Sequence, residues 1–364
     1  MPKTTRLAPS RRAVLAGGLA GAALAGFGFP SIVRAADKSL KVGVYGGYFK
    51  DSFDQHIFPE FTKATGIAIE SVAEPTGEAW LVQLEQAARA KQAPADVSMI
   101  SQTSMLKGAS VELWAPLNEA KIPGAKNVHA HLQNRYADGR LMGVGAVAWY
   151  ITLVSNTEVF PEAPTSWAEF WDPKHKDQLG LLALVSNSFL LEVTSTTFFD
   201  GTAILDTEDG ILKVMDKIAE LKPNVKLWYR DEAQFEQALK SGEIPMGQYY
   251  HDVTGLAAAD GHPVRSTFPK EGGITDSGSW AVSKASEKLD LAEVFIEYMC
   301  QPAIQAQLSR KVGTAPTIDR KLTDLTDAEF AAVSSDIPPI VPRYDLYQEK
   351  ADWLSQKWTE LIVG

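Results

Sequence analysis

Leu40-Lys-Val-Gly-Val-Tyr45 alternates apolar residues with polar or small ones, and Gly46-Gly47 follows it directly. The alternation predicts a strand, and the glycine pair predicts a sharp turn at its end. Residues 53–65 then place apolar side chains at helical spacing before Gly66, which predicts a helix that ends there. Three further segments continue as strand, amphipathic helix and strand: 67–72, 80–91 and 95–100. This order predicts an α/β fold with a parallel sheet and crossover helices.

Segments of the same kind recur towards the C-terminus. Apolar spacing predicts helices at 211–221, 232–240, 289–300 and 344–362, and a strand at 246–250. Internal repeats, low-complexity tracts and heptad seams are absent from the sequence. A chain of 364 residues is long enough for two cores, so two α/β lobes are expected.

The N-terminal segment has the composition of an export signal. Arg11-Arg12 precede an uncharged stretch rich in Ala, Gly and Leu, and Val33-Arg34-Ala35 places small residues at the −3 and −1 positions of a cleavage site. We predict a cleavable signal peptide over 1–35, with the arginine pair indicating the twin-arginine route. A membrane anchor is the alternative, but Gly and Ala contribute little transfer energy. The mature protein is therefore expected in the periplasm.

Cysteine content and charge narrow the class further. Cys300 is the only cysteine, so no internal disulfide can form. A lipoprotein would need a cysteine at the cleavage site, and this sequence has none there, so we predict that the protein is not a lipoprotein. Loss of the signal takes the formal net charge from −10 to −15, because that segment carries five basic residues and no acidic one. An acidic surface disfavours nucleic acid and anionic lipid as partners.

Sequence motifs for catalysis are missing. The chain has no G-x-S-x-G, no Walker loop, no H-E-x-x-H and no C-x-x-C. His129 and His131 lie close in sequence; they could form a metal pair, or they could be two solvated loop histidines. We predict no enzymatic activity, no cofactor and no metal, and expect capture of a solute in a cleft between the lobes.

Several short motifs carry a family resemblance. In chain order they are Phe61-Thr-Lys-Ala-Thr-Gly66, Asp96-Val97, Thr165-Ser-Trp-Ala-Glu-Phe-Trp-Asp-Pro-Lys-His-Lys176, Ser241-Gly-Glu243, Pro269-Lys-Glu-Gly-Gly-Ile274 and the helix 292–302. Together they resemble the periplasmic spermidine/putrescine-binding type of solute-binding protein that serves ABC importers, over nearly the whole mature chain. The resemblance implies a type II periplasmic binding fold, with two α/β lobes joined by a hinge.

The resemblance also implies how the chain is divided. The first lobe would comprise 37–147 and 277–322, and the second lobe 148–276 and 323–364. Within the longest motif, Thr165 or Ser166 is expected to cap a short helix that packs its aromatic residues inward. Residues 269–273 are expected to form a turn between the lobes, shaped by Glu271.

The ligand contacts that the resemblance implies are largely changed in this chain. A tyrosine of the family falls on Thr103, an acidic anchor on Asn187, an aspartate on Gly278 and a late tyrosine on Thr314, while Tyr250 stands where the family has tryptophan. Asp276 lies two residues from the missing aspartate. The site must therefore be built from the residues that are present.

Strand ends supply most of the candidates, because open α/β sheets present ligands there. Tyr45 with Gly46-Gly47 ends the first strand, where glycine N–H groups can hold a carbonyl or an anion, and Tyr250 with Asp252 ends a later one. Asp276 with Trp280 could cage an ammonium group, and Arg230 could clamp a carboxylate. The predicted ligand-binding residues are Tyr45, Gly46, Gly47, Thr103, Asn187, Arg230, Tyr250, Asp252, Asp276 and Trp280.

These observations predict a monomeric solute-binding protein that closes over a small amine-bearing solute. A polyamine or a short ω-amino acid would fit, and membrane permease subunits with a cytoplasmic ATPase are the implied partners. Two alternatives stay open at this point. Tyr249-Tyr250 could bind ferric iron, because phenolates are hard oxygen donors, and an exported hydrolase could assemble its site only in the fold.

Overall fold

The computed structural model describes residues 38–75, 79–90 and 93–363. The predicted signal peptide, 1–35, lies outside the described residues. The strands are β1 (Ser39–Tyr45), β2 (Ala68–Glu74), β3 (Val97–Ser101), β4 (Gln133–Arg135), β5 (Leu141–Asn156), β6 (Leu179–Leu182), β7 (Val225–Tyr229), β8 (Met246–Tyr250), β9 (Val264–Thr267) and β10 (Ile274–Val282). They form one sheet in the order β2-β1-β3-β10-β5-β8-β6-β7, with β4 and β9 paired to β5.

Helices connect most of these strands. They are α1 (Tyr48–His56), α2 (Phe58–Thr65), α3 (Ala79–Ala90), α4 (Gln102–Ser110), α5 (Val185–Ser188), α6 (Leu190–Phe198), α7 (Glu208–Ala219), α8 (Glu232–Ser241), α9 (His251–Ala259), α10 (Leu289–Met299), α11 (Pro302–Val312), α12 (Asp327–Ala331), α13 (Tyr344–Glu349) and α14 (Ala351–Val363). The predicted α/β class is confirmed, and the strands at 40–45 and 246–250 lie within one residue of their predicted bounds.

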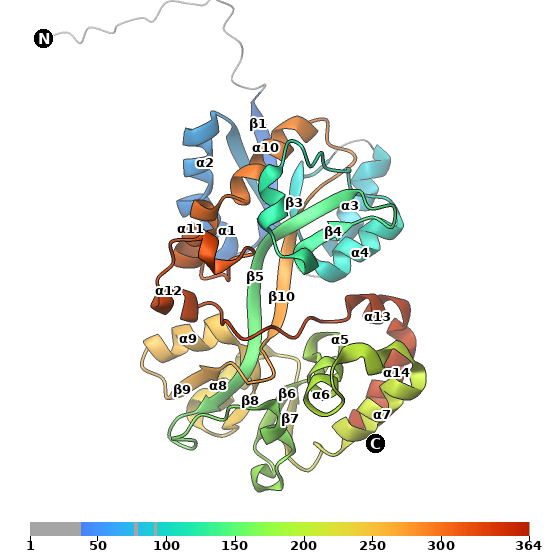
Figure 1. The fold of residues 1–364 in the computed structure, drawn as a ribbon, viewed down its shortest axis with the longest axis vertical. Helices are drawn as coiled ribbons and strands as arrows, with labels where there is room; N and C mark the ends of the chain where they lie inside the picture. The colour runs from blue at the N-terminus through green and yellow to red at the C-terminus, as the bar shows by residue number, and fades with distance from the viewer. Residues whose placement is uncertain (1–37, 76–78, 91–92, 364) are drawn as a thin grey trace, which may run out of the picture. The chain divides into compact units, whose positions relative to one another are not determined.

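Two long antiparallel strands connect the two halves of the sheet. β10 pairs with β5 from Ile274↔Ile151 to Ala281↔Gly143, and its end also pairs with β3. The other end of β5 pairs with β8 and β9. Figure 1 shows β5 and β10 side by side, running from the elements around β1 and β3 to those around β6 and β8. The parallel pairing expected for the first three strands is present, because β1 pairs in parallel with both β2 and β3. The antiparallel strands β5 and β10, which the sequence did not predict, join this part of the sheet to the parallel strands β6, β7 and β8.

Each half has its own hydrophobic core. The first gathers Phe53, Trp280 and Phe295 around β1, α1 and α10. The second gathers Trp167, Phe235 and Trp358 around β6, α8 and α14. Contacts between residues do not divide the chain beyond Lys38 into separate units. The lobe boundaries implied by the resemblance therefore stay a prediction.

Two predicted helices are each divided in the structure. The helix expected at 53–65 is broken at Ile57, between α1 and α2. Pro59 explains the break, because proline has no N–H to donate and its ring would clash with the carbonyl group four residues earlier. The helix expected at 344–362 is likewise divided at Lys350, between α13 and α14.

The segment that carries the longest motif folds as expected. Ser166 caps a 3-10 turn, Trp167–Trp171, by accepting a hydrogen bond from the Ala168 N–H. The Glu271 carboxylate accepts hydrogen bonds from the Ser166 hydroxyl and the Trp167 N–H, and the Trp167 indole donates to the Gly272 carbonyl at 2.8 Å. Gly272 has φ 104°, and a Cβ there would lie 2.2 Å from a backbone oxygen, so this turn requires glycine.

Candidate ligand-binding site

A cavity lies where β1, β2 and β3 end. It has a volume of about 620 Å³ and receives side chains from both halves of the sheet. α8, β8 and α9 border it opposite the three strand ends, and Trp149 of β5 lies between them. Carboxyl ends of parallel strands are the expected place for a ligand in an open α/β sheet. Its lining residues are Tyr45, Gly46, Phe49, Glu74, Pro75, Trp80, Leu81, Met99, Ile100, Ser101, Ser104, Trp149, Glu232, Tyr250, Asp252 and Val253.

Aromatic rings form much of this first cavity. Tyr45 packs edge-on against Phe49 and Trp149, with ring centroids 5.9 and 6.4 Å apart. Tyr250 lies on the β8 side and donates its hydroxyl to Glu232 at 3.0 Å. Such rings offer apolar contact to methylene groups and a negative π-face to a cation.

Three carboxyl groups line the same cavity. Glu74 accepts a hydrogen bond from the Met99 N–H at 3.1 Å, Glu232 accepts the Tyr250 hydroxyl, and Asp252 Oδ1 is buried without a hydrogen-bond partner among the described residues. Burial raises the pKa of Glu74 and of Asp252. The described lining of this cavity includes no Lys, Arg or His side chain. The cavity therefore presents acidic groups for which its described lining provides no counter-charge.

A second cavity of about 470 Å³ adjoins the first. Ser101, Ser104 and Tyr250 line both cavities. Asp276 borders the second cavity, and its Oδ1 accepts hydrogen bonds from the Tyr344 hydroxyl at 2.6 Å and from the Ser277 N–H at 2.8 Å. Burial raises the pKa of Asp276. Tyr344 begins α13, so the C-terminal part of the chain closes this side of the cleft.

The structure places seven of the ten predicted site residues at these cavities. Tyr45, Gly46 and Asp252 line the first cavity, Thr103, Asn187 and Asp276 line the second, and Tyr250 lines both. Whether these residues contact a ligand stays a prediction.

Gly47, Arg230 and Trp280 line neither cavity. Gly47 caps α1 with φ 66°, and Arg230 is exposed just before α8. Trp280 is 0% exposed and packs edge-on against Phe53 and Phe295 in the first core. A buried indole in that core cannot cage an ammonium group with Asp276, so the structure does not form the predicted pair.

Several lining residues were not predicted from the sequence. They are Phe49, Glu74, Trp80, Trp149 and Glu232. Glu74 lies two residues beyond the predicted strand 67–72, so the strand-end rule would have included it if β2 had been predicted at its full length. Trp149 had no local signal, because β5 is buried along nearly its whole length and lacks alternation.

The geometry does not favour the ferric-iron alternative. The Tyr250 hydroxyl donates to Glu232, whereas the Tyr249 hydroxyl donates to Glu236 at 3.4 Å. Burial raises the pKa of both phenols, which opposes the phenolate form that binds iron. Tyr249 does not line the first or the second cavity, so the two hydroxyls do not meet at one site.

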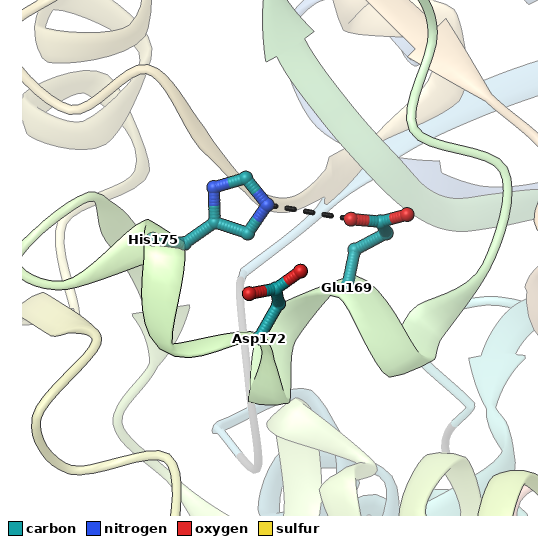
Figure 2. Close-up of side chains that lie close together, drawn as sticks. All are labelled: Glu169, Asp172 and His175. Atoms are coloured by element: carbon teal, nitrogen blue, oxygen red, sulfur yellow. Dashed lines mark hydrogen bonds and ion pairs between the residues drawn. The ribbon is translucent and has the colours of Figure 1, made fainter.

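Potential metal ligands come together elsewhere. Glu169, Asp172 and His175 have ligand atoms within 4.8 Å of one another. Figure 2 shows the three side chains pointing towards one another, with His175 hydrogen-bonded to Glu169. The Lys174 ammonium already pairs with Glu169 at 3.1 Å and with Asp172 at 2.8 Å, which offsets part of the negative charge of the two carboxylates. His129 and His131 stack with centroids 5.7 Å apart, and no third ligand joins them among the described residues.

Comparison with solved structures identifies the fold. An ABC transporter substrate-binding protein from Bradyrhizobium japonicum is 22% identical with a TM-score of 0.73, covering 89% of this chain and 99% of that one. The fold is thus that of a type II periplasmic binding protein, with two α/β lobes joined by a hinge. No helix in the described ranges has the length and apolar character needed to cross a membrane.

Sequence comparison identifies the family. Residues 56–331 match the family described as bacterial extracellular solute-binding protein, and the chain belongs to that family. The Gamma-aminobutyric acid-binding protein of Pseudomonas aeruginosa is 25% identical over 298 residues, which cover 80% of this chain and 81% of that protein. The Spermidine/putrescine-binding periplasmic protein of Escherichia coli is 22% identical over 282 residues, which cover 76% and 77%. The predicted resemblance is confirmed.

Proposed function

We propose that this chain is the periplasmic binding component of an ABC importer, which captures a small amine-bearing solute between its lobes. The observation that supports this most strongly is the first cavity, where Glu74, Glu232 and Asp252 lie beside aromatic rings and find no counter-charge in the described lining. The relatives whose names specify γ-aminobutyric acid, spermidine and putrescine bind solutes that share a primary amine.

An ammonium group would supply what the cavity lacks. Burying a carboxylate without a counter-charge costs free energy, and a bound cation removes that cost. The rings of Tyr45, Trp149 and Tyr250 would add cation–π attraction of about 0.5–2 kcal/mol each at favourable geometry. Because α8 and α9 provide two of the carboxyl groups and β2 the third, these contacts form together only when the lobes are close.

The far end of the solute would lie in the second cavity. Asp276 would receive the second ammonium group of a diamine. Thr103 and Asn187 could donate hydrogen bonds to the carboxylate of an ω-amino acid. Arg230 remains a predicted carboxylate ligand, which would have to move towards the cleft on closure.

The remaining features of this proposal concern processing and assembly. Residues 1–35 would be removed as a twin-arginine signal, leaving a monomer that is not a lipoprotein. Residues 37–147 with 277–322 would form the first lobe, and 148–276 with 323–364 the second. The closed form would deliver its solute to permease subunits driven by a cytoplasmic ATPase, without catalysis or a cofactor.

Thermal unfolding of the mature protein tests the proposal. The panel should contain putrescine, spermidine, γ-aminobutyrate, a quaternary amine and a ferric salt. A solute present at 100 times its Kd should add about 2.7 kcal/mol of stability. No stabilisation by any amine would contradict the proposal, and stabilisation by the ferric salt alone would favour the iron alternative.

A matched pair of variants locates the site. Asp252→Asn should weaken amine binding about 10- to 100-fold, since a charge-assisted hydrogen bond is worth about 1.5–3 kcal/mol. Asp260→Asn removes an exposed carboxylate at the other end of α9 and should leave the affinity unchanged. Equal affinities for the two variants would place the amine elsewhere.

A further inference from the structure

Glu74 occupies an unusual position in the sheet. β1 lies between β2 and β3, but it pairs with β3 only at Val42↔Val97 and Gly43↔Ser98. Beyond these residues the Glu74 side chain crosses β1 from β2, and its Oε1 accepts the Met99 N–H of β3 at 3.1 Å. A Cβ on Gly43 would lie 2.4 Å from that oxygen, so the glycine leaves room for the carboxyl group.

The described groups around this carboxyl group are neutral or acidic. Glu74 is 6% exposed and borders the first cavity. The groups packed against it are the Tyr45 phenol of β1, Ser98 and Met99 of β3, and Trp80 of α3. The ionisable groups of the other elements around the cavity are all acidic or phenolic: Glu232 of α8, Tyr250 of β8, Asp252 of α9 and, beyond Tyr45, Asp276 of β10.

We infer that Glu74 holds a proton in the unliganded protein and releases it to solvent when the ammonium group of the solute enters the first cavity. The inference rests on the proposed function, and it adds a binding residue whose charge the solute itself controls. The solute stays protonated throughout, and the proton that leaves is the one on the carboxyl group. Binding would therefore create a carboxylate–ammonium pair out of a neutral acid and a cation.

The electrostatics support both the protonation of Glu74 in the unliganded protein and its ionisation when an ammonium group binds. Desolvation raises the pKa of the Glu74 carboxyl well above its ordinary range, and hydrogen bonds from the Met99 N–H, Ser98 and Trp80 only partly oppose it. Burial and the nearby carboxyl groups also raise the pKa of Tyr45, so the neighbouring phenol stays neutral. A cation within about 4–6 Å would lower the pKa of a carboxyl group by about 1–3 units. Affinity should rise up to about tenfold per pH unit between the liganded and the unliganded pKa, and level off above the latter.

Calorimetric titration of the mature protein tests the exchange. Putrescine and γ-aminobutyrate are each titrated between about pH 5 and 8 in pairs of buffers that differ in ionisation enthalpy. The wild type should release up to one proton per bound amine, with affinity rising over the same pH range. Glu74→Gln keeps an acceptor for the Met99 N–H and should lower both the proton release and the pH dependence of affinity, leaving only the part that Asp252 contributes. Glu70→Gln, an exposed residue of the same strand paired with Lys41 at 3.5 Å, should behave as the wild type.

Each failure of this experiment has a separate meaning. If amines bind the wild type without proton release, or if Glu74→Gln releases protons as the wild type does, the inference is overturned and the proposed function survives. If neither amine binds at any pH, the proposed function fails and the inference fails with it. Carbon-13 NMR of glutamate-labelled wild type provides a readout without any substitution, because one carboxyl resonance should move to its ionised position on binding. Absence of that shift with bound amine would overturn the inference.

Discussion

Gly43→Ala would test how the first cavity is built. The added methyl group would lie 2.4 Å from Glu74 Oε1 and 3.1 and 3.2 Å from its Cγ and Cδ. The first distance is far below van der Waals contact and the other two are tight, so the Glu74 side chain must move. The Met99 N–H would then lose its acceptor inside the sheet.

The expected loss of stability follows from these two effects. A buried N–H left without a partner costs about 1–3 kcal/mol. Inserting a methylene-sized group into a packed site costs a further 1–3 kcal/mol or so. We expect Gly43→Ala to lower the free energy of unfolding by about 3 kcal/mol. Glu74→Ala alone should cost about 1–3 kcal/mol for the unpaired N–H.

Urea denaturation of the single and double variants measures this coupling. All three atoms nearest to a Cβ on Gly43 belong to Glu74, so Gly43→Ala should cost less than about 1 kcal/mol once Glu74 is alanine. Gly46→Ala is the control, because its nearest atom is 3.8 Å away and its change should stay within about 1 kcal/mol. The reasoning is refuted if the two substitutions add within about 0.5 kcal/mol, or if Gly46→Ala costs as much as Gly43→Ala.

Two further predictions concern the second half of the sheet. Glu271→Ala removes the acceptor of the Ser166 hydroxyl and the Trp167 N–H, so urea denaturation should show a loss of about 1–3 kcal/mol; an unchanged midpoint would contradict this role. Glu192 is fully buried and accepts the Tyr347 hydroxyl and the Arg343 N–H, and desolvation raises its pKa. The native state therefore binds this proton more tightly than the unfolded state, and the stability of the wild type should fall as pH rises from about 4.3 through the native pKa. Glu192→Gln should show a smaller fall, because only the other buried carboxyl groups with raised pKa then contribute to it. Parallel pH profiles of the two proteins from urea midpoints would refute the assignment.

Local sequence patterns were sufficient for the elements that depend on neighbouring residues. The alternation of 40–45 and the apolar spacing of 232–240 correspond to β1 and α8, because burial of one face imposes a period along a strand or helix. The pattern did not reveal β5, since a strand buried on both faces has no alternation to detect. It also passed over the break at Ile57, although Pro59 was visible in the sequence.

The residues of the candidate site likewise include some that a local pattern predicts and some that it does not. Tyr45, Tyr250 and Asp252 could be predicted because they end strands or begin the helices that follow, and strand ends meet at one edge of a sheet. Trp280 was predicted to lie in the binding site with Asp276, but it lies in the first core. Closeness in sequence to Asp276 does not tell which of the two side chains enters the core.

By itself the sequence determined the α/β class, the family resemblance and the strand ends that carry cavity-lining side chains, because these depend on periodicity and short motifs. Only the tertiary structure decided that Glu74, Trp149 and Glu232 share one cavity. Those three residues lie on β2, β5 and α8, and long-range strand pairing brings them together. Only the tertiary structure also decided that the described lining of this cavity holds no basic side chain beside these acidic groups. That property depends on which side chains the fold brings to the cavity, and a local sequence pattern does not contain it.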